Sequence, residues 1–117
     1  MISAPQPQPQ RPPVPRQCQR YPVDFSLKVF SPGTAGATTG RSGDISVSGL
    51  SFYAPIELTA GQSIQLHFSL PHSQIAFGVW AIVQNANGFR YGVEFTRLSE
   101  RENEEIVRVC RILELKR

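Results

Sequence analysis

The chain contains few of the residues that carry metal or redox chemistry. Its 117 residues include two cysteines, Cys18 and Cys110, and two histidines. Two widely separated cysteines do not make a disulfide framework, and together with two scattered histidines they are too few for a zinc site. We expect no metal and no cofactor, and two free thiols in a reducing cytoplasm. A redox role for Cys18, which lies between two arginines, has only that spacing in its favour.

Long apolar runs are also missing. No stretch approaches the roughly 18 apolar residues of a membrane-spanning helix, so we expect no direct membrane span. The start of the chain has neither the basic region nor the apolar core of a secretory signal. These absences predict a cytoplasmic location, either for a separate protein or for the cytoplasmic domain of a membrane protein. No acid–base dyad, nucleophile elbow or phosphate-binding loop is visible, so we expect no enzymatic activity.

The composition is that of one globular domain with a mild positive charge. The hydrophobic share is 40%, the charged share is 18%, and the net charge is +3. A mildly basic domain favours an anionic partner without choosing among nucleotide, nucleic acid and membrane surface. The dense basic and aromatic strand face of a barrel that binds single-stranded nucleic acid is absent, so we expect no nucleic acid partner.

Residues 1–15 differ from the rest of the chain. They hold six prolines and three glutamines and no aromatic residue. Because proline lacks a backbone N–H and fixes φ, the segment is expected to be a disordered, solvated arm or linker. A proline-rich ligand for the groove of another protein is the alternative. The folded domain is expected to span residues 16–117.

Alternation of apolar and polar residues then predicts about six short strands. They fall near residues 23–29, 38–47, 50–53, 64–70, 75–84 and 89–95. Asn87-Gly88 suits a type I′ turn between the last two strands. The alternation in the last strand predicts a buried aromatic face that includes Phe89 and Phe95.

One helix is expected after the strands. Ser99 and Glu102 form an S-x-x-E capping box, which is typical of a helix start. Apolar residues at Ile106, Val109, Cys110 and Leu113 follow at helical spacing and form one apolar face. The order of elements predicts an all-β fold with one helix, an antiparallel barrel with a C-terminal α-helix that covers an opening or an edge.

Two short motifs lie on either side of the first predicted hairpin. Arg16 and Arg20 form R-x-x-x-R, and Asp44, Ser46 and Gly49 form D-x-S-x-x-G. Together with the late strand Y-G-V-E-F at residues 91–95, they resemble the PilZ domain, a bacterial receptor for cyclic di-GMP. The resemblance covers roughly residues 16–113. It implies a six-stranded antiparallel β-barrel with a C-terminal α-helix, and a nucleotide-binding role for both motifs.

The chemistry of these residues suits such a ligand. A guanidinium can fork onto guanine O6 and N7 or pair with a phosphate, which favours Arg16 and Arg20. The carboxylate of Asp44 can accept from the N1–H and N2–H₂ edge of guanine. Ser46 offers a hydroxyl, and Gly49 lets backbone approach closely.

Other interpretations of the same residues stay open. Arg41 is the best accessory contact, whereas Arg90 and Arg97 are expected to be solvated charges on a strand face. Asp44 and Ser46 also suit a hydrogen-bonded turn at a strand end. Gly49 also suits a β-bulge.

We therefore expect a sensor or effector module that binds cyclic di-GMP and signals by ordering its N-terminal arginine arm. Its partner is expected to be another protein or a covalently linked effector domain, as in a larger enzyme such as a cellulose synthase. The alternative is a PilZ-like adaptor that binds a protein and no nucleotide.

Overall fold

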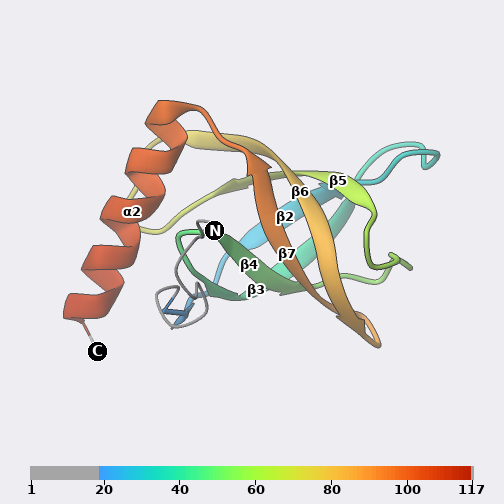
Figure 1. Cartoon of the computed structure of the whole chain (residues 1–117), viewed down its shortest axis with the longest axis horizontal. Helices are drawn as coiled ribbons and strands as arrows, with labels where there is room; N and C mark the ends of the chain where they lie inside the picture. The colour runs from blue at the N-terminus through green and yellow to red at the C-terminus, as the bar shows by residue number, and fades with distance from the viewer. Residues whose placement is uncertain (1–18, 117) are drawn as a thin grey trace, which may run out of the picture.

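A computed structural model describes residues 19–116, which form a closed antiparallel barrel with one helix (Figure 1). The elements are β1 (Tyr21–Pro22), β2 (Ser26–Phe30), β3 (Thr38–Ile45), β4 (Gly49–Tyr53), β5 (Ser63–Ser69), β6 (Ala76–Asn87), β7 (Arg90–Arg97) and helix α2 (Glu100–Leu115). The strand order is β1-β3-β2-β5-β6-β7-β4, and pairing of β3 with β4 closes the ring. Six strands make the barrel, and the two residues of β1 extend the edge of β3. The expected fold class is confirmed.

The core follows from the alternation along the strands. Leu27, Val29, Leu66 and Val79 lie on neighbouring strands and are almost completely buried. Burial of such side chains removes apolar surface from water, at roughly 25 cal/mol per Å². The barrel interior is therefore filled by side chains, and any ligand site has to lie on its outer surface or at its rim.

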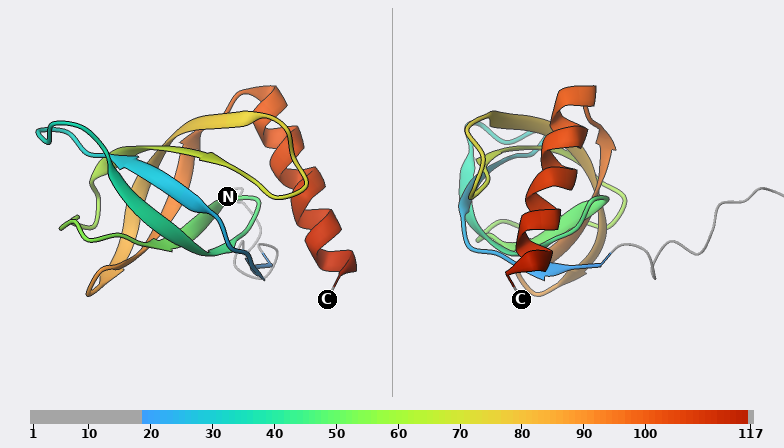
Figure 2. Two further views of the ribbon diagram at one scale, coloured as in Figure 1. Left: turned by 180° about the vertical axis from the view of Figure 1, so that it is seen from behind. Right: turned by 90° about the vertical axis from the view of Figure 1, so that its left-hand side faces the viewer.

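Helix α2 lies across one end of the barrel (Figure 2). Ile106, Val109 and Cys110 are buried against the core, as the helical spacing predicted. The capping box is also confirmed, because the backbone N–H of Glu102 donates to Oγ of Ser99 at 3.0 Å and the Glu102 carboxylate accepts the Ser99 N–H at 3.0 Å.

Polar contacts attach the same helix to the loop between β5 and β6. Ser73 Oγ donates to Oε2 of Glu105 at 2.6 Å. Arg108 Nη2 donates to the same carboxylate oxygen at 2.7 Å and to the backbone oxygen of His72 at 2.6 Å. The two hydrogen bonds to Glu105 lower the pKa of its carboxyl group from 4.5 to about 2, and the bond from Arg108 has the larger effect, followed by that from Ser73.

The β6–β7 turn differs from the sequence prediction. Asn87 pairs with Arg90, so the two central residues are Gly88 and Phe89. Only Gly88 has a positive φ, +67°, which fits the type II′ pattern with glycine first and not type I′. Phe89 lies in this turn and is 55% exposed, so its predicted burial is wrong. Phe95, farther along β7, is partly buried against the core.

The first predicted strand is interrupted between β1 and β2, beside a bulge in β3. The register of β3 against β4 shifts between Ser42 and Asp44. There the Ser42 hydroxyl donates to the backbone oxygen of Val23 at 2.7 Å and accepts the backbone N–H of Phe25 at 2.9 Å. The Ser42 side chain thus joins the segment between β1 and β2 to β3, beside the backbone hydrogen bonds from Val23 to Gly43 and from Ser42 to Phe25.

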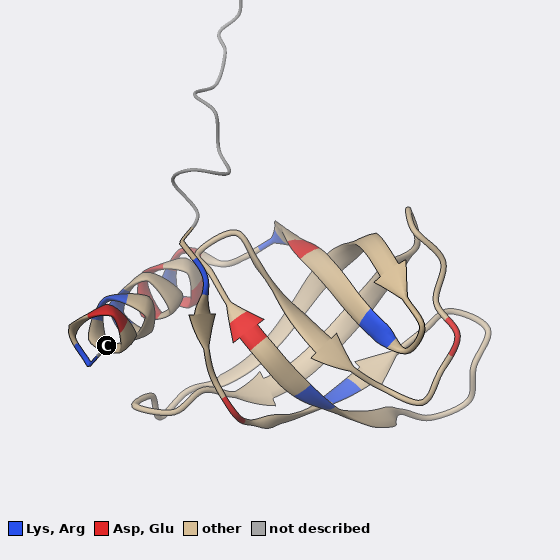
Figure 3. Ribbon diagram, turned by 90° about the horizontal axis from the view of Figure 1, so that it is seen from below, with Lys and Arg blue, Asp and Glu red and all other residues tan. Residues whose placement is uncertain are grey.

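Seen from below, the barrel shows no cluster of residues with one sign of charge. Basic and acidic positions are interspersed along the helix and the strands (Figure 3). In the part of the chain that the structure describes, α2 is the α-helix, and this helix is not long and apolar enough to cross a bilayer. An anion-binding site on this barrel would therefore have to be a local constellation of side chains.

Candidate functional site

Asp44 lies next to the bulge, on the outer surface where β3 pairs with β4. Its backbone N–H donates to Oγ of Ser51 at 3.1 Å. The neighbouring Ile45 and Leu50 point into the core and are fully buried. Because side chains alternate along a strand, Asp44 and Ser51 are directed outward. The Asp44 side chain is 23% exposed, so its carboxylate is fixed by the strand and still reachable.

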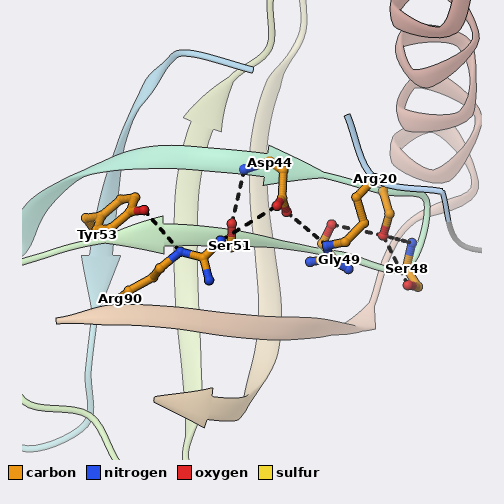
Figure 4. A network of polar contacts seen from close by, with 8 residues as sticks. Arg20, Asp44, Ser48, Gly49, Ser51, Tyr53 and Arg90 are labelled. Carbon is orange, nitrogen blue, oxygen red and sulfur yellow. Dashed lines mark hydrogen bonds and ion pairs between the residues drawn. The ribbon is translucent and has the colours of Figure 1, made fainter. Parts of the chain in front are cut away.

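Two arginines approach this carboxylate from different parts of the chain (Figure 4). Arg20, just before β1, donates from Nε to Oδ1 of Asp44 at 3.0 Å. Arg90, the first residue of β7, places Nη2 at 3.8 Å from Oδ2. Nε of Arg90 donates to the hydroxyl of Tyr53 at 3.1 Å. The fold thus gathers residues from the chain before β1 and from β3, β4 and β7.

A pocket of about 280 Å³ opens beside these residues. Besides Arg20, Asp44 and Arg90, its lining includes Gln84, Asn85 and Glu94. Nε2 of Gln84 donates to Oε1 of Glu94 at 2.9 Å. Guanidiniums, carboxylates and neutral side-chain amides line one concave surface, which suits a ligand with both acceptor and donor edges.

Ser46 belongs to the β3–β4 turn and not to the pocket wall. It is fully buried. Its Oγ accepts the backbone N–H of Ser48 at 3.2 Å and donates to the backbone oxygen of Gly49 at 3.3 Å. The turn interpretation of the D-x-S motif therefore describes this serine. Ser48 is the turn residue that lines the pocket.

Gly49 begins β4 in close contact with β7. A Cβ at this position would lie 2.0 Å from the backbone oxygen of Val93. The backbone N–H of Phe95 also donates to the oxygen of Ser48 at 2.9 Å. Backbone does approach closely at Gly49, but it is that of the barrel's own strand, and a ligand contact at Gly49 stays a prediction. The glycine therefore allows the barrel to close next to the motif.

The structure does not bring Arg41 to this pocket. Arg41 Nη2 pairs instead with the carboxylate of Asp24. It lines a separate hollow that also includes Tyr53 and Phe89. Arg41 lies opposite Tyr53 and Asp44 opposite Ser51, so the bulge leaves both side chains on the same face of the sheet. The ion pair with Asp24, and not the bulge, therefore keeps the guanidinium of Arg41 from Asp44. Its role as an accessory contact stays a prediction without support from this geometry.

Sequence reasoning missed Arg90. It was expected to be a solvated charge, yet it lies in the pocket beside Asp44. No local motif marks it, and only the cross-strand pairing of Tyr53 with Arg90 shows where it lies. Arg97, at the other end of β7, is exposed as expected. Arg16 and Cys18 lie outside the described residues.

Within residues 19–116 no group of three or more His, Cys, Asp or Glu side chains is arranged to hold a metal ion. Cys110 is buried, and desolvation raises the pKa of its thiol to about 11. A thiol with so high a pKa is a poor nucleophile, because the thiolate is the reactive form. Among the described residues, the candidate site is therefore the pocket lined by Arg20, Asp44 and Arg90.

Solved structures that share the fold include three with TM-scores above 0.6. The PilZ domain of CeSA from a cellulose-synthesizing bacterium is 18% identical, with a TM-score of 0.63 over 82% of this chain and 98% of that one. The PilZ domain of YcgR from Escherichia coli, solved with c-di-GMP, is 17% identical, with a TM-score of 0.67 over 86% and 92%. The Bacillus subtilis inhibitor of motility MotI/DgrA is 16% identical, with a TM-score of 0.74 over 92% of this chain but 53% of that chain, so this chain spans about half of that protein.

No curated protein sequence matches the chain significantly. The family model of the PilZ domain does match, over residues 15–111. This range includes the whole barrel, both motifs and most of helix α2. The match and the barrel topology agree, and the chain belongs to the PilZ domain family.

Proposed function

We propose that this PilZ domain is a sensor that binds cyclic di-GMP at the pocket beside Arg20 and Asp44. The observation that carries the proposal is the 3.0 Å contact between these two side chains, one from each sequence motif, at the edge of that pocket. Two motifs that are far apart in the sequence thus form one constellation. The PilZ domain of YcgR, a structural neighbour, was solved with this ligand.

The proposed contacts follow from the donors and acceptors of the two partners. Arg20, and Arg16 by its place in the motif, would donate to phosphate oxygens or to guanine O6 and N7. Asp44 would accept from the N1–H and N2–H₂ edge of a guanine or hold Arg20 in place. Ser46 and Gly49 would act through the backbone of the turn, since Ser46 is fully buried and the nearest neighbour of Gly49 is β7.

Ordering of the arginine arm is the proposed signal. The contact of Arg20 with Asp44 is partly exposed, with 44% of the Arg20 side chain accessible. Exposed ion pairs contribute only about 0–1 kcal/mol, so the phosphates of a ligand can redirect this guanidinium. Residues 1–15, which precede the arginine motif, would then act as the linker between the domain and an effector. The effector would be either a protein partner or the rest of a larger enzyme such as a cellulose synthase.

Calorimetric titration of the full chain with cyclic di-GMP tests the binding step. We expect a dissociation constant in the micromolar range or tighter, about −8 kcal/mol. GMP is the control ligand, because it has one guanine and one phosphate and cannot bridge two sites. Absence of heat and of a thermal shift at high ligand excess, with the barrel folded, would overturn the proposal.

The adaptor function is the second candidate. Trp80 and Phe89 are 42% and 55% exposed, and large exposed aromatic side chains are common at protein interfaces. An adaptor of this kind would show no nucleotide-dependent heat. The same titration therefore separates the two functions.

A further inference from the structure

Arg90 is held in a defined orientation at the start of β7. It pairs across the sheet with Tyr53 of β4. Its Nε donates to the Tyr53 hydroxyl at 3.1 Å, and its guanidinium carbon lies 5.7 Å from the centre of the tyrosine ring. A hydrogen bond and a cation–π contact on one partner restrict the rotamers of a long side chain. Arg90 therefore presents its remaining donors in a fixed direction.

Those remaining donors point to the ligand pocket. Nη2 of Arg90 lies 3.8 Å from Oδ2 of Asp44, which is beyond hydrogen-bond distance. Arg20 donates to the other oxygen of the same carboxylate. Among the described residues, no acceptor forms a hydrogen bond with the terminal nitrogens of Arg90. The side chain is 46% exposed, so an incoming acceptor can reach them.

The charges around Asp44 favour an anion next to Arg90. Two guanidiniums share one carboxylate, and Arg20 makes the shorter contact with it. The second carboxylate of the pocket, Glu94, accepts the side-chain amide of Gln84. The positive charge of Arg90 is thus the least compensated by hydrogen bonds in this constellation.

We infer that Arg90 is a third ligand-binding arginine of this domain, and that Tyr53 is its positioning residue. This inference rests on the proposed function, because the ligand is cyclic di-GMP at the same pocket. The terminal nitrogens of Arg90 donate to an acceptor of the bound nucleotide from the β7 side, opposite the arginine motif. The rigid strand supplies this arginine, whereas Arg20 precedes the barrel.

Titration of the full chain with cyclic di-GMP tests the inference. Arg90→Ala is expected to weaken affinity about 10-fold or more, because hydrogen bonds to charged groups contribute about 1.5–3 kcal/mol. Arg97→Ala is the matched control, since Arg97 ends the same strand and lies in a separate hollow beside Trp80. It removes the same charge from β7 and is expected to leave affinity within about twofold of the unaltered chain.

Two further variants separate a directed contact from net charge. Arg90→Lys keeps the charge without the planar fork and is expected to recover only part of the affinity. Tyr53→Phe is expected to weaken binding less than Arg90→Ala. Its effect should disappear in an Arg90→Ala background, because the hydroxyl acts through the guanidinium. A purely structural tyrosine would weaken binding equally in both backgrounds.

The outcomes are distinguishable. If the unaltered chain does not bind cyclic di-GMP, both the proposed function and this inference are overturned. If Arg20→Ala loses affinity while Arg90→Ala matches the unaltered chain, only the role of Arg90 is wrong. Full recovery by Arg90→Lys would show that only charge matters, and would overturn the directed contact.

Discussion

Arg20 donates from Nε to Oδ1 of Asp44 across 3.0 Å, although the two residues are 24 positions apart. From the sequence, Arg20 has no acidic partner nearby. The fold provides one, because β1 and β3 pair and bring Pro22 opposite Asp44. The contact joins the two motifs. A ligand that takes this guanidinium would have to displace the carboxylate of Asp44.

The arginine motif is expected to supply most of the affinity. Arg20→Ala and Arg16→Ala should each weaken cyclic di-GMP binding by about 10-fold or more while leaving the barrel folded, because each removes charge-assisted hydrogen bonds and no core packing. Calorimetry together with circular dichroism measures both properties. Arg97→Ala is the control, and equal losses in all three variants would mean that the site is misplaced.

Asp44→Ala is expected to weaken binding less than Arg20→Ala. The substitution removes an acceptor for guanine, but it also releases Arg20 from an ion pair that competes with the ligand. The backbone hydrogen bond from Asp44 to Ser51 remains, so the strand should keep its place. Ser46→Ala should also have a smaller effect than the arginine changes. A loss at Asp44 that exceeds the loss at Arg20 in calorimetry would contradict this ranking.

Gly49→Ala is expected to destabilise the fold. The added Cβ would lie 2.0 Å from the backbone oxygen of Val93, and overpacking of this kind costs about 1–3 kcal/mol or more. Gly78→Ala is the control, because its Cβ would meet the His67 ring at an ordinary 3.5 Å. Chemical denaturation measures both variants. Equal midpoints would show that β4 and β7 are not so closely packed.

Attachment of helix α2 is expected to depend on pH through Glu105. The pKa of Glu105 is lowered from 4.5 to about 2 in the folded protein, so its contribution to stability is complete above about pH 4.5 and is lost as the pH falls toward 2. Urea denaturation across this range should show the unaltered chain losing its advantage over Glu105→Gln. Glu104→Gln, an exposed neighbour on the same helix, is the control. A constant difference between pH 6 and pH 2 would contradict the contact.

Ligand is expected to order the chain before the barrel. The backbone amides of Gln19 and Arg20, which precede β1, should gain protection from hydrogen exchange when cyclic di-GMP is added. Val93 lies in the closed sheet and should change little. Equal protection of Gln19 and Arg20 with and without ligand would indicate a preformed site. The proposed signal would then be wrong even if binding were confirmed.

Local patterns along the chain were sufficient to predict the strands of the barrel and the C-terminal helix. Alternation reports which side chains face the core, and the capping box of Ser99 reports a helix start, because both signals act between near neighbours. The β6–β7 turn was displaced by one residue, since Asn87 continued the ladder to Arg90 and moved Phe89 into the turn. Turn position depends on the register of both strands, which neither strand contains alone.

The candidate site, too, has features that follow from the sequence and features that follow only from the fold. The sequence by itself determined the two motifs, and the resemblance to the family rests on them. Only the tertiary structure decided which side chains share the pocket, because Arg41 pairs with Asp24 and cross-strand pairing brings Arg90 opposite Tyr53. A strand's register against its neighbours is set by contacts distant in sequence, so it cannot be deduced from the spacing of residues along the chain.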